Sequence, residues 1–291
     1  MKQLISDYLE LTKPKVVLLM LLTSLVGMCM ASEYGLHLSA VLLGTIGIAF
    51  GAGGAAVLNH VADQHLDKLM RRTENRPVAT GKVSTVQSLL FAGVLIALSM
   101  WILFQWVNAV TAILTFFSLI VYAVIYTLYL KHTTPQNIVI GGIAGAIPPL
   151  LGWTAIAGGI DPHALLLVLI IFVWTPPHFW ALAIHRYEDY KSAKVPMLPN
   201  THGIPYTKLH ILLYTLLLVA VTILPYSTGM SGTLYFAGVM LLNARFLYWV
   251  IKLYRFSEPN TAIKTFRYSI TYLGLLFLLL LLDHITGGGI R

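Results

Sequence analysis

Three polar residues, Asn59, Asp63 and Asp67, recur every four positions in a polar segment between two strongly apolar stretches. On a helix, such side chains lie on one face, about 6 Å apart. Two carboxylates placed this way repel each other unless a cation lies between them. Mg²⁺ is commonly held by one or two carboxylates while substrate phosphate oxygens and water complete its coordination. The spacing therefore predicts that Asp63 and Asp67 are catalytic metal ligands and that Asn59 binds substrate beside them.

Basic residues follow the aspartates at once, and their position favours a phosphate-containing ligand. Arg72 and Arg76 are four positions apart, and a guanidinium can donate two parallel hydrogen bonds to phosphate oxygens. Cytoplasmic loops carry basic residues in any case, and the aspartates could be solvated charges at a helix end. An amide and two carboxylates continuous with a membrane helix are nevertheless costly unless they have a function. We therefore expect Arg72 and Arg76 to bind a diphosphate.

The composition requires that this polar segment be held by a membrane protein. Hydrophobic residues make up 57% of the 291 residues, charged residues 10%, and the mean hydropathy is +0.78, far from the range of soluble domains. Stretches of about 20 apolar residues are long enough to cross a bilayer. They predict an all-α polytopic bundle of nine transmembrane helices in a single domain, 1–291, with helices near 16–33, 39–58, 86–106, 109–130, 138–158, 164–185, 209–228, 233–251 and 268–286.

The distribution of basic residues predicts the orientation of the bundle. If nine helices alternate, one side of the membrane collects 17 of the 19 lysines and arginines. This bias places the N-terminus and the polar segment in the cytoplasm, and it explains the net charge of +8 without nucleic acid as a partner. The N-terminal residues lack the pattern of a cleaved signal or transit peptide. The single cysteine, Cys29, excludes an intramolecular disulfide. We expect a multi-pass protein of a bacterial inner (plasma) membrane.

A second long loop lies on the same side, after the helix at 164–185. It again begins with acidic residues, including Asp189, and continues with Lys191 and Lys194. The two loops are separated by four predicted helices, and a weak internal repeat would bring them face to face across a central cavity. We expect Asp189 to be catalytic and the two lysines to bind substrate.

Six further positions near or within the helices could contribute to the site. Lys131 and Asn137 flank the turn between the helices at 109–130 and 138–158, although Lys131 could equally be a topology charge. His178 lies inside the helix at 164–185, where it could contact or ligate a substrate or form a hydrogen bond within the bundle. Tyr122, Tyr126 and Tyr129 have helical spacing and could shield a cation or simply pack together.

Longer motifs resemble a known family. Asn59, Asp63 and Asp67, followed by Arg72-Thr73 and Arg76-Pro77, look like the first diphosphate motif of the intramembrane prenyltransferase superfamily. Four other stretches are similar to the protohaem IX farnesyltransferases, also called haem O synthases, and the resemblance spans nearly the whole chain. These stretches are LTKPK at 11–15, the Pro148-Pro149 pair, WTPPHFW at 174–180 and VPMLP at 195–199.

One departure from the superfamily favours this branch. The second motif of the superfamily usually has two aspartates four positions apart, but Ala193 follows Asp189 at that spacing. Haem O synthases share this reduced motif, which leaves open whether a second Mg²⁺ is bound. A lysine could supply part of the missing positive charge.

The resemblance implies the substrates. They are farnesyl diphosphate and haem B, with Mg²⁺ as cofactor, and the product is haem O. A haem A synthase and a terminal oxidase are implied downstream. Two alternatives remain open: prenyl transfer to another aromatic or ring acceptor, and a non-enzymatic transporter of haem or lipid.

Overall fold

The computed structural model describes residues 2–256, 258 and 260–288, and in this part of the chain all regular structure is helical. Eight segments of this described part of the chain are long and apolar enough to span a membrane. A ninth span results if α1 (Lys2–Leu11) and α2 (Pro14–Met30), which meet at a bend of 51°, are counted together. The eight are α3 (Leu38–Ala62), α5 (Thr85–Trp106), α6 (Ala109–Ile120) with η2 (Val121–Leu130) and α7 (Lys131–Thr133), α8 (Asn137–Ala146) with α9 (Pro148–Ala157), α10 (Pro162–His185), α13 (Ile204–Ser227), α14 (Thr233–Arg255) and α15 (Thr261–Ile285).

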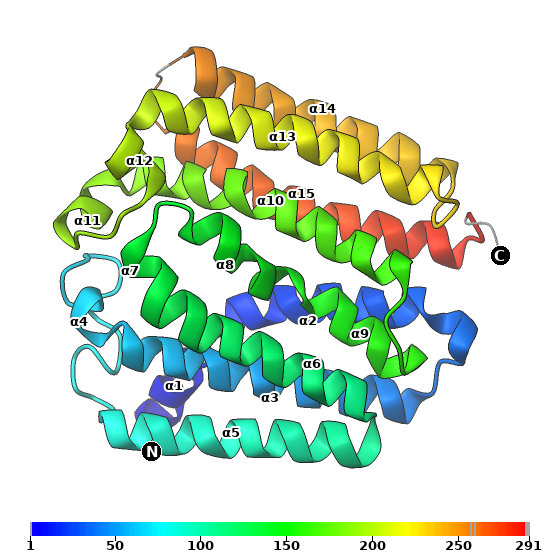
Figure 1. Cartoon of the computed structure of the whole chain (residues 1–291), viewed down its shortest axis with the longest axis horizontal. Coiled ribbons are helices and arrows are strands. Elements are labelled where there is room, and N and C mark those ends of the chain that lie inside the picture. The colour runs from blue at the N-terminus through cyan, green and yellow to red at the C-terminus, as the bar shows by residue number, and fades with distance from the viewer. Residues whose placement is uncertain (1, 257, 259, 289–291) are drawn as a thin grey trace.

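The spanning helices lie side by side, and their connections gather at two ends (Figure 1). Residues 63–84 and 186–203 both lie at one of these ends, on the left in Figure 1, which we call the polar end. It carries the short helices α4 (Gln64–Asp67), α11 (Tyr187–Ser192) and α12 (Leu198–His202), whereas η1 (Ser32–Tyr34) lies at the other. The prediction of an all-helical polytopic bundle is confirmed.

The separation of α5 from α6 depends on two residues. Val107 leaves the helical region of backbone space with φ −116° and ψ −94°, which ends α5. The Asn108 side chain then accepts a hydrogen bond from the Thr111 backbone N–H at 2.8 Å and caps α6. The sequence therefore forms two antiparallel helices here, as predicted, and not one long helix.

Glycine permits a close contact between α2 and α9. A Cβ atom on Gly27 would overlap the Pro149 carbonyl, and a Cβ atom on Gly152 would overlap the Ser24 carbonyl. Each helix thus supplies a glycine against the backbone of the other. Small residues allow this approach in membranes, where helix association depends on packing.

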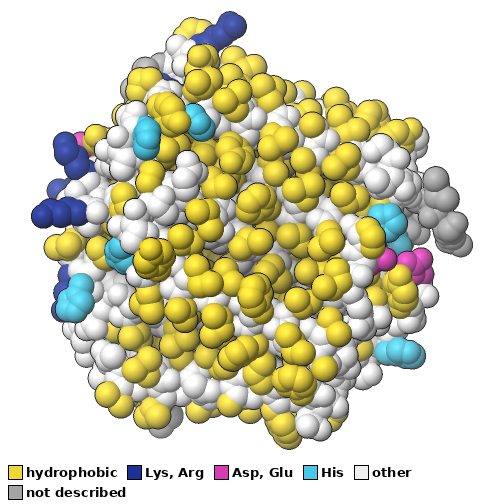
Figure 2. All heavy atoms as spheres, viewed as in Figure 1, with side chains coloured by type: hydrophobic (Ala, Val, Ile, Leu, Met, Phe, Trp, Pro, Cys, Tyr) yellow, Lys and Arg dark blue, Asp and Glu magenta, His cyan; other side chains and the backbone are white. Residues whose placement is uncertain are grey.

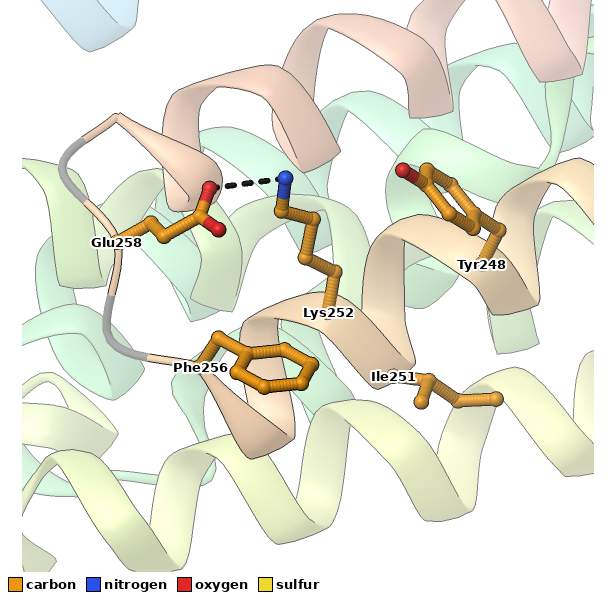
Figure 3. A pocket seen from close by; sticks show the side chains of 5 residues that line it. All are labelled: Tyr248, Ile251, Lys252, Phe256 and Glu258. Carbon is orange, nitrogen blue, oxygen red and sulfur yellow. Dashed lines mark ion pairs between the residues drawn. The ribbon is translucent and has the colours of Figure 1, made fainter.

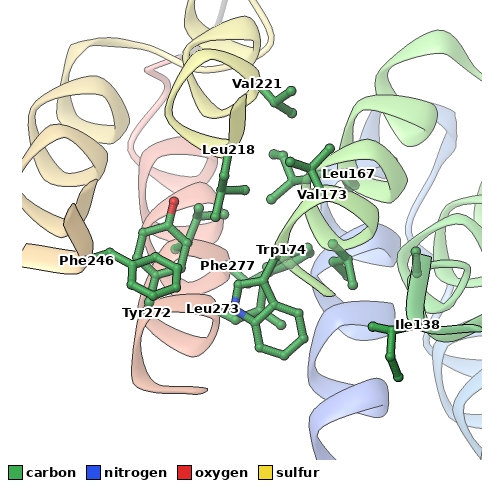
Figure 4. Close-up of a cluster of buried hydrophobic side chains, with 14 of the residues drawn as sticks. Ile138, Leu167, Val173, Trp174, Leu218, Val221, Phe246, Tyr272, Leu273 and Phe277 are labelled. Carbon is green, nitrogen blue, oxygen red and sulfur yellow. The ribbon is translucent and has the colours of Figure 1, made fainter. Parts of the chain in front are cut away.

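The largest apolar core fills the space among α10, α13, α14 and α15 and reaches α2. Figure 4 shows Trp174 of α10 facing Leu273 and Phe277 of α15, with Leu218 of α13 and Phe246 of α14 nearby. The outside of the bundle is apolar as well: large side chains such as Leu90 and Leu241 are 67% and 74% exposed. Figure 2 shows this apolar surface across the middle of the molecule, with most of the basic side chains in view gathered toward the polar end. Such a surface matches a lipid environment.

Candidate functional site

The predicted metal ligands lie where α3 passes into α4 at the polar end. α3 ends at Ala62 and Asp63 interrupts the regular helix, but the helical hydrogen bonds continue. The Asp63 N–H donates to the Asn59 carbonyl at 2.9 Å, and the Asp67 N–H donates to the Asp63 carbonyl at 2.8 Å. Asn59, Asp63 and Asp67 are only 4%, 3% and 1% exposed. These three side chains therefore form the buried row that the spacing predicts, which we call the ligand row.

Each member of this row contacts one basic side chain. Lys131 forms an ion pair with Asp63, with Nζ 2.6 Å from Oδ2. Arg76 Nη1 lies 2.8 Å from both carboxylate oxygens of Asp67. Lys13, which lies between α1 and α2, donates to Asn59 Oδ1. Because three separate segments of the chain supply these basic side chains, the segments of the polar end meet at this row.

The π-helix η2 positions two residues that contact this row: Thr127 lies within it and Lys131 directly after it. Its wider turn lets the Thr127 hydroxyl donate to the Tyr122 carbonyl, five residues earlier, at 2.8 Å. Thr127 Oγ1 then accepts a hydrogen bond from Asn59 Nδ2 at 3.1 Å, and Lys131 follows directly after η2. π-helical segments occur frequently at functional sites. This segment points Thr127 and Lys131 at the ligand row.

The donor set of the row fits a magnesium ion. Asn59 Nδ2 donates to Asp63 Oδ2 at 3.0 Å, whereas Asp63 Oδ1 is buried and has no hydrogen-bond partner among the residues that the structure describes. A buried, unpaired carboxylate oxygen is costly in the absence of a ligand. No three His, Cys, Asp or Glu residues in the described part of the chain are close enough to hold a metal on their own. A site with so few protein donors suits Mg²⁺, whose coordination is commonly completed by phosphate oxygens and water.

The second loop approaches the first, as predicted. The Ser192 hydroxyl lies 3.5 Å from the Leu69 carbonyl. Burial raises the pKa of the Tyr190 phenol in α11, while Arg72 and Arg76 act in the opposite direction, which places this side chain within electrostatic reach of the first loop. Asp189 lies 3.5 Å from Arg186 and lines a small cleft of about 200 Å³ with His185 and its neighbours.

The structure does not bring every predicted residue to the aspartates. Lys191 and Lys194 are exposed; the Lys191 ammonium lies 5.8 Å from the centre of the Tyr187 ring, and Lys194 has a φ of 53°. Arg72 is exposed on the first loop and makes no ion pair with any described residue. Asn137 is buried at the start of α8, where its Nδ2 donates to the Thr134 carbonyl at 2.7 Å and its Oδ1 has no partner among the described residues.

His178 is held between α10 and α15 by aromatic stacking. Its ring stacks on Trp174 and Phe266, with centroid distances of 4.2 and 4.5 Å. Nδ1 lies 2.7 Å from Ser269 Oγ, and the Ser269 hydroxyl donates to the Phe266 carbonyl at 2.6 Å. Because a hydroxyl has one proton to donate, Nδ1 must donate to Ser269, which leaves the lone pair on Nε2. The partner of His178 is thus a hydroxyl and not a backbone carbonyl of its own helix.

An open groove of about 350 Å³ lies elsewhere, at the end of α14 (Figure 3). Tyr248, Ile251 and Phe256 line it, and Lys252 pairs across it with Glu258 at 2.8 Å. None of the predicted site residues belongs to this groove. Its apolar lining continues the lipid-facing surface, so we do not assign the chemistry to it.

Sequence reasoning missed two residues of the site. Lys13 was noted only as part of the LTKPK motif, and Thr127 gave no signal, because both contacts join distant positions in the chain. Of the three tyrosines with helical spacing, Tyr122 and Tyr126 stack with a centroid distance of 5.8 Å, but Tyr129 is 65% exposed. The π-helix shifts Tyr129 out of the face that ordinary helical spacing predicts.

Comparison with known proteins agrees with the geometry. A model of the UbiA prenyltransferase family matches residues 20–281. Proteins named protoheme IX farnesyltransferase from Marinobacter nauticus and Stutzerimonas stutzeri are each 60% identical over 278 residues, which cover 96% of this chain and 92% and 93% of theirs.

Solved structures share the fold. A digeranylgeranylglyceryl phosphate synthase has a TM-score of 0.81 at 20% identity, covering 98% of this chain and 100% of its own. A UbiA homologue from Archaeoglobus fulgidus bound to GPP and Mg²⁺ has a TM-score of 0.65 at 18% identity, with 94% and 99% covered. The chain belongs to the UbiA prenyltransferase family and, within it, to the group of protohaem IX farnesyltransferases.

Proposed function

We propose that this chain transfers the farnesyl group of farnesyl diphosphate to the 2-vinyl group of protohaem IX (haem B), with addition of water, to give haem O and diphosphate. The observation that carries the proposal is the buried row of Asn59, Asp63 and Asp67, with one basic side chain on each. The identity of about 60% to protoheme IX farnesyltransferases supports the choice of haem as acceptor.

Asp63 and Asp67 would hold Mg²⁺, which neutralises negative charge on the diphosphate as it leaves. Asp63 Oδ1 has its lone pairs free for this purpose, whereas Asp67 must first part from Arg76. Arg76, Lys131 and the exposed Arg72 would donate to the diphosphate oxygens. Fixed donors of this kind stabilise charge that develops on a leaving group.

The second loop would complete the diphosphate site. Asp189 is the remaining carboxylate there, and Lys191 and Lys194 would add positive charge where the family motif lacks its second aspartate. Their exposed side chains are long enough to turn inward when a diphosphate binds. Asn137, with its free buried Oδ1, would contact the substrate from α8.

The chemistry needs no protein nucleophile. The bond between farnesyl C1 and oxygen breaks, and its electron pair leaves with the diphosphate. The π electrons of the haem vinyl group form the new bond to C1, and water adds to the cation left beside the porphyrin and loses a proton. The apolar bundle would bury the farnesyl chain and keep water from C1 until the vinyl group has attacked.

His178 would contact the haem. With Nδ1 donating to Ser269, Nε2 is available to the iron, and the stacked rings of Trp174 and Phe266 fix its direction. The basic polar end supports a plasma-membrane orientation with the site toward the cytoplasm. A haem A synthase or a terminal oxidase would then use the product.

The test is an assay with purified protein, Mg²⁺, farnesyl diphosphate and haem B, in which product mass and released diphosphate are both measured. Asp63→Asn and Asp67→Asn should each lower the rate by about 100-fold or more, since each removes a charge that the leaving group requires. Glu74→Gln, an exposed carboxylate on the same loop, serves as the matched control and should retain the rate.

Each alternative has its own signature in this assay. A product mass without haem would identify another acceptor. Absence of diphosphate release from the wild-type chain would favour a transporter, and full activity of Asp63→Asn or Asp67→Asn would remove the metal assignment.

A further inference from the structure

Each of three basic side chains contacts the oxygen atoms of one residue in the ligand row. Lys13 occupies Asn59 Oδ1, Lys131 occupies Asp63 Oδ2, and Arg76 occupies both oxygens of Asp67. The carboxylates of Asp63 and Asp67 are 5% and 2% exposed as side chains, so neither can be balanced by water. In this arrangement the protein places its own basic side chains where the metal would coordinate.

The pairing follows from the cost of burying charge. Removing one partner of a buried ion pair is strongly destabilising because the other charge is left uncompensated. A divalent ion that enters alone can reach the unpaired Asp63 Oδ1, but it must compete with Lys131 for Asp63 Oδ2 and displace Arg76 from Asp67. Both cations would then remain beside it without an anion. A diphosphate that enters alone would find the same two cations already bound to aspartates. Each ligand alone therefore meets a penalty.

The two ligands together remove this penalty. The pairs Asp63–Lys131 and Asp67–Arg76 are each neutral, and a prenyl diphosphate carries about three negative charges against the two positive charges of the metal. Asp63 and Asp67 would hold the metal, and Lys131 and Arg76 would then donate to the diphosphate. Lys13, whose Nζ already donates to Asn59 Oδ1 next to both pairs, would offset the remaining negative charge once the diphosphate is bound.

We propose that Arg76 and Lys131 are exchangeable counter-cations: they hold Asp67 and Asp63 until metal and substrate bind and then transfer to the diphosphate, where Lys13 joins them from Asn59. This assigns Lys13 as a further diphosphate-binding residue. The proposal rests on the proposed function in that it takes Asp63 and Asp67 as the metal ligands. Its consequence is that metal and diphosphate bind cooperatively, each raising the affinity for the other by the same factor.

The first arm of the test measures metal alone. Mn²⁺, as a spectroscopic substitute for Mg²⁺, is titrated into the detergent-solubilised full chain, and free Mn²⁺ is followed by electron paramagnetic resonance. Lys131→Met should bind Mn²⁺ at least about 10-fold more tightly than the wild type, because Asp63 has lost its competitor. Lys131→Arg, which keeps the competing charge, should remain close to the wild type. Unchanged or weaker Mn²⁺ binding by Lys131→Met would overturn the proposal.

Should Lys131→Met fail to fold, Arg76→Met gives the same measurement at a more open position. The Arg76 side chain is 18% exposed, compared with 10% for Lys131, so its removal disturbs the core less. The expected result is again tighter Mn²⁺ binding, and the same contrary result counts against the proposal.

The second arm measures anion alone. Inorganic diphosphate is titrated by calorimetry in the presence of EDTA, so that no metal takes part. Asp67→Asn should bind it at least about 10-fold more tightly than the wild type, because Arg76 is free, although the same variant should lose activity. Glu74→Gln is the matched control. Equal or weaker diphosphate binding by Asp67→Asn would contradict the exchange.

The third arm concerns Lys13. With saturating Mn²⁺, Lys13→Met should bind diphosphate at least about 10-fold more weakly, whereas Lys15→Met, an exposed lysine of the same motif, should match the wild type. Equal affinity in the two variants would remove Lys13 from the site. All three arms measure binding, so a wild-type chain that binds as described but forms no haem O would refute the proposed function and leave the exchange standing.

Discussion

At the scale of single residues, the site is defined by which atom each side chain presents. His178 illustrates this, because its protonation is set by a neighbour: Ser269 donates to Phe266, so the imidazole must donate to Ser269. The nitrogen that remains is a competent iron ligand. The sequence alone leaves His178 either as a haem contact or as a hydrogen-bonded residue of the bundle. The structure adds which ring nitrogen donates to Ser269.

His178→Ala should therefore alter haem binding. We expect at least about a 10-fold loss in haem B affinity and a shift of the Soret band, since the iron loses a nitrogen ligand. Haem B is titrated optically without farnesyl diphosphate, so the result does not depend on turnover. His65→Ala, an exposed histidine at the same end, is the control. An unchanged spectrum and affinity in His178→Ala would assign this histidine to packing.

At the scale of elements, η2 is a local irregularity that allows a hydrogen bond to a residue far away in the sequence. Its hydrogen bond from Thr127 to Tyr122 spans five positions, and the same hydroxyl accepts from Asn59. In an ordinary α-helix over 121–130, the Thr127 and Lys131 side chains would point in other directions around the helix axis than they do here. The π-helix is thus what aligns this segment with α3.

Thr127→Val should loosen that alignment. Loss of a hydrogen bond worth about 1 kcal/mol predicts a fall of about fivefold in kcat/KM for farnesyl diphosphate, with little change in thermal stability. Thr133→Val, which removes an exposed hydroxyl bonded to the Tyr129 carbonyl, should leave the kinetics intact. If both variants behave alike, the Thr127 contact contributes nothing to the site.

The contact of α2 with α9 makes a second prediction at this scale. Gly152→Ala should destabilise the protein by about 1–3 kcal/mol, because the added methyl group overlaps the Ser24 carbonyl and the backbones must separate. The measurement is thermal unfolding in detergent. Gly93→Ala on α5, where a Cβ meets nothing within 4 Å, should be neutral or slightly stabilising. Equal melting temperatures would mean that the two helices do not pack this closely.

At the scale of the whole molecule, charge decides which end faces which compartment. The polar end holds the two long loops and gathers the lysines and arginines, whereas η1 at the opposite end carries none. The apolar surface between the ends fits a bilayer. Orientation is therefore a property of the whole chain and not of one segment.

Labelling of introduced cysteines tests this orientation. In a Cys29→Ala background, E33C should react with a membrane-impermeant maleimide in intact spheroplasts, because Glu33 lies in η1. K82C, on the first loop at the polar end, should react only after the membrane is opened. The reverse pattern would place the site on the outer side of the membrane.

Much of this protein was determined by sequence alone. Long apolar stretches specify helices within a few residues, since backbone polar groups in lipid must be satisfied within the segment. The Asn59, Asp63 and Asp67 row is equally local, because a spacing of four fixes a common helix face. The end of α3 was less predictable: the sequence predicts a helix to 58, but α3 continues to Ala62 and Asp63 interrupts it.

Only the tertiary structure determined which basic side chain contacts which residue of the ligand row. Lys13 and Asn59 are 46 positions apart, and Asn59 and Thr127 are 68 apart. Nothing in local spacing selects such partners, because they depend on the bend between α1 and α2, on the π-helix, and on how the bundle closes. The sequence therefore determined the ligand row and the class of chemistry. The fold determined that the row is already paired, and so how the site must open.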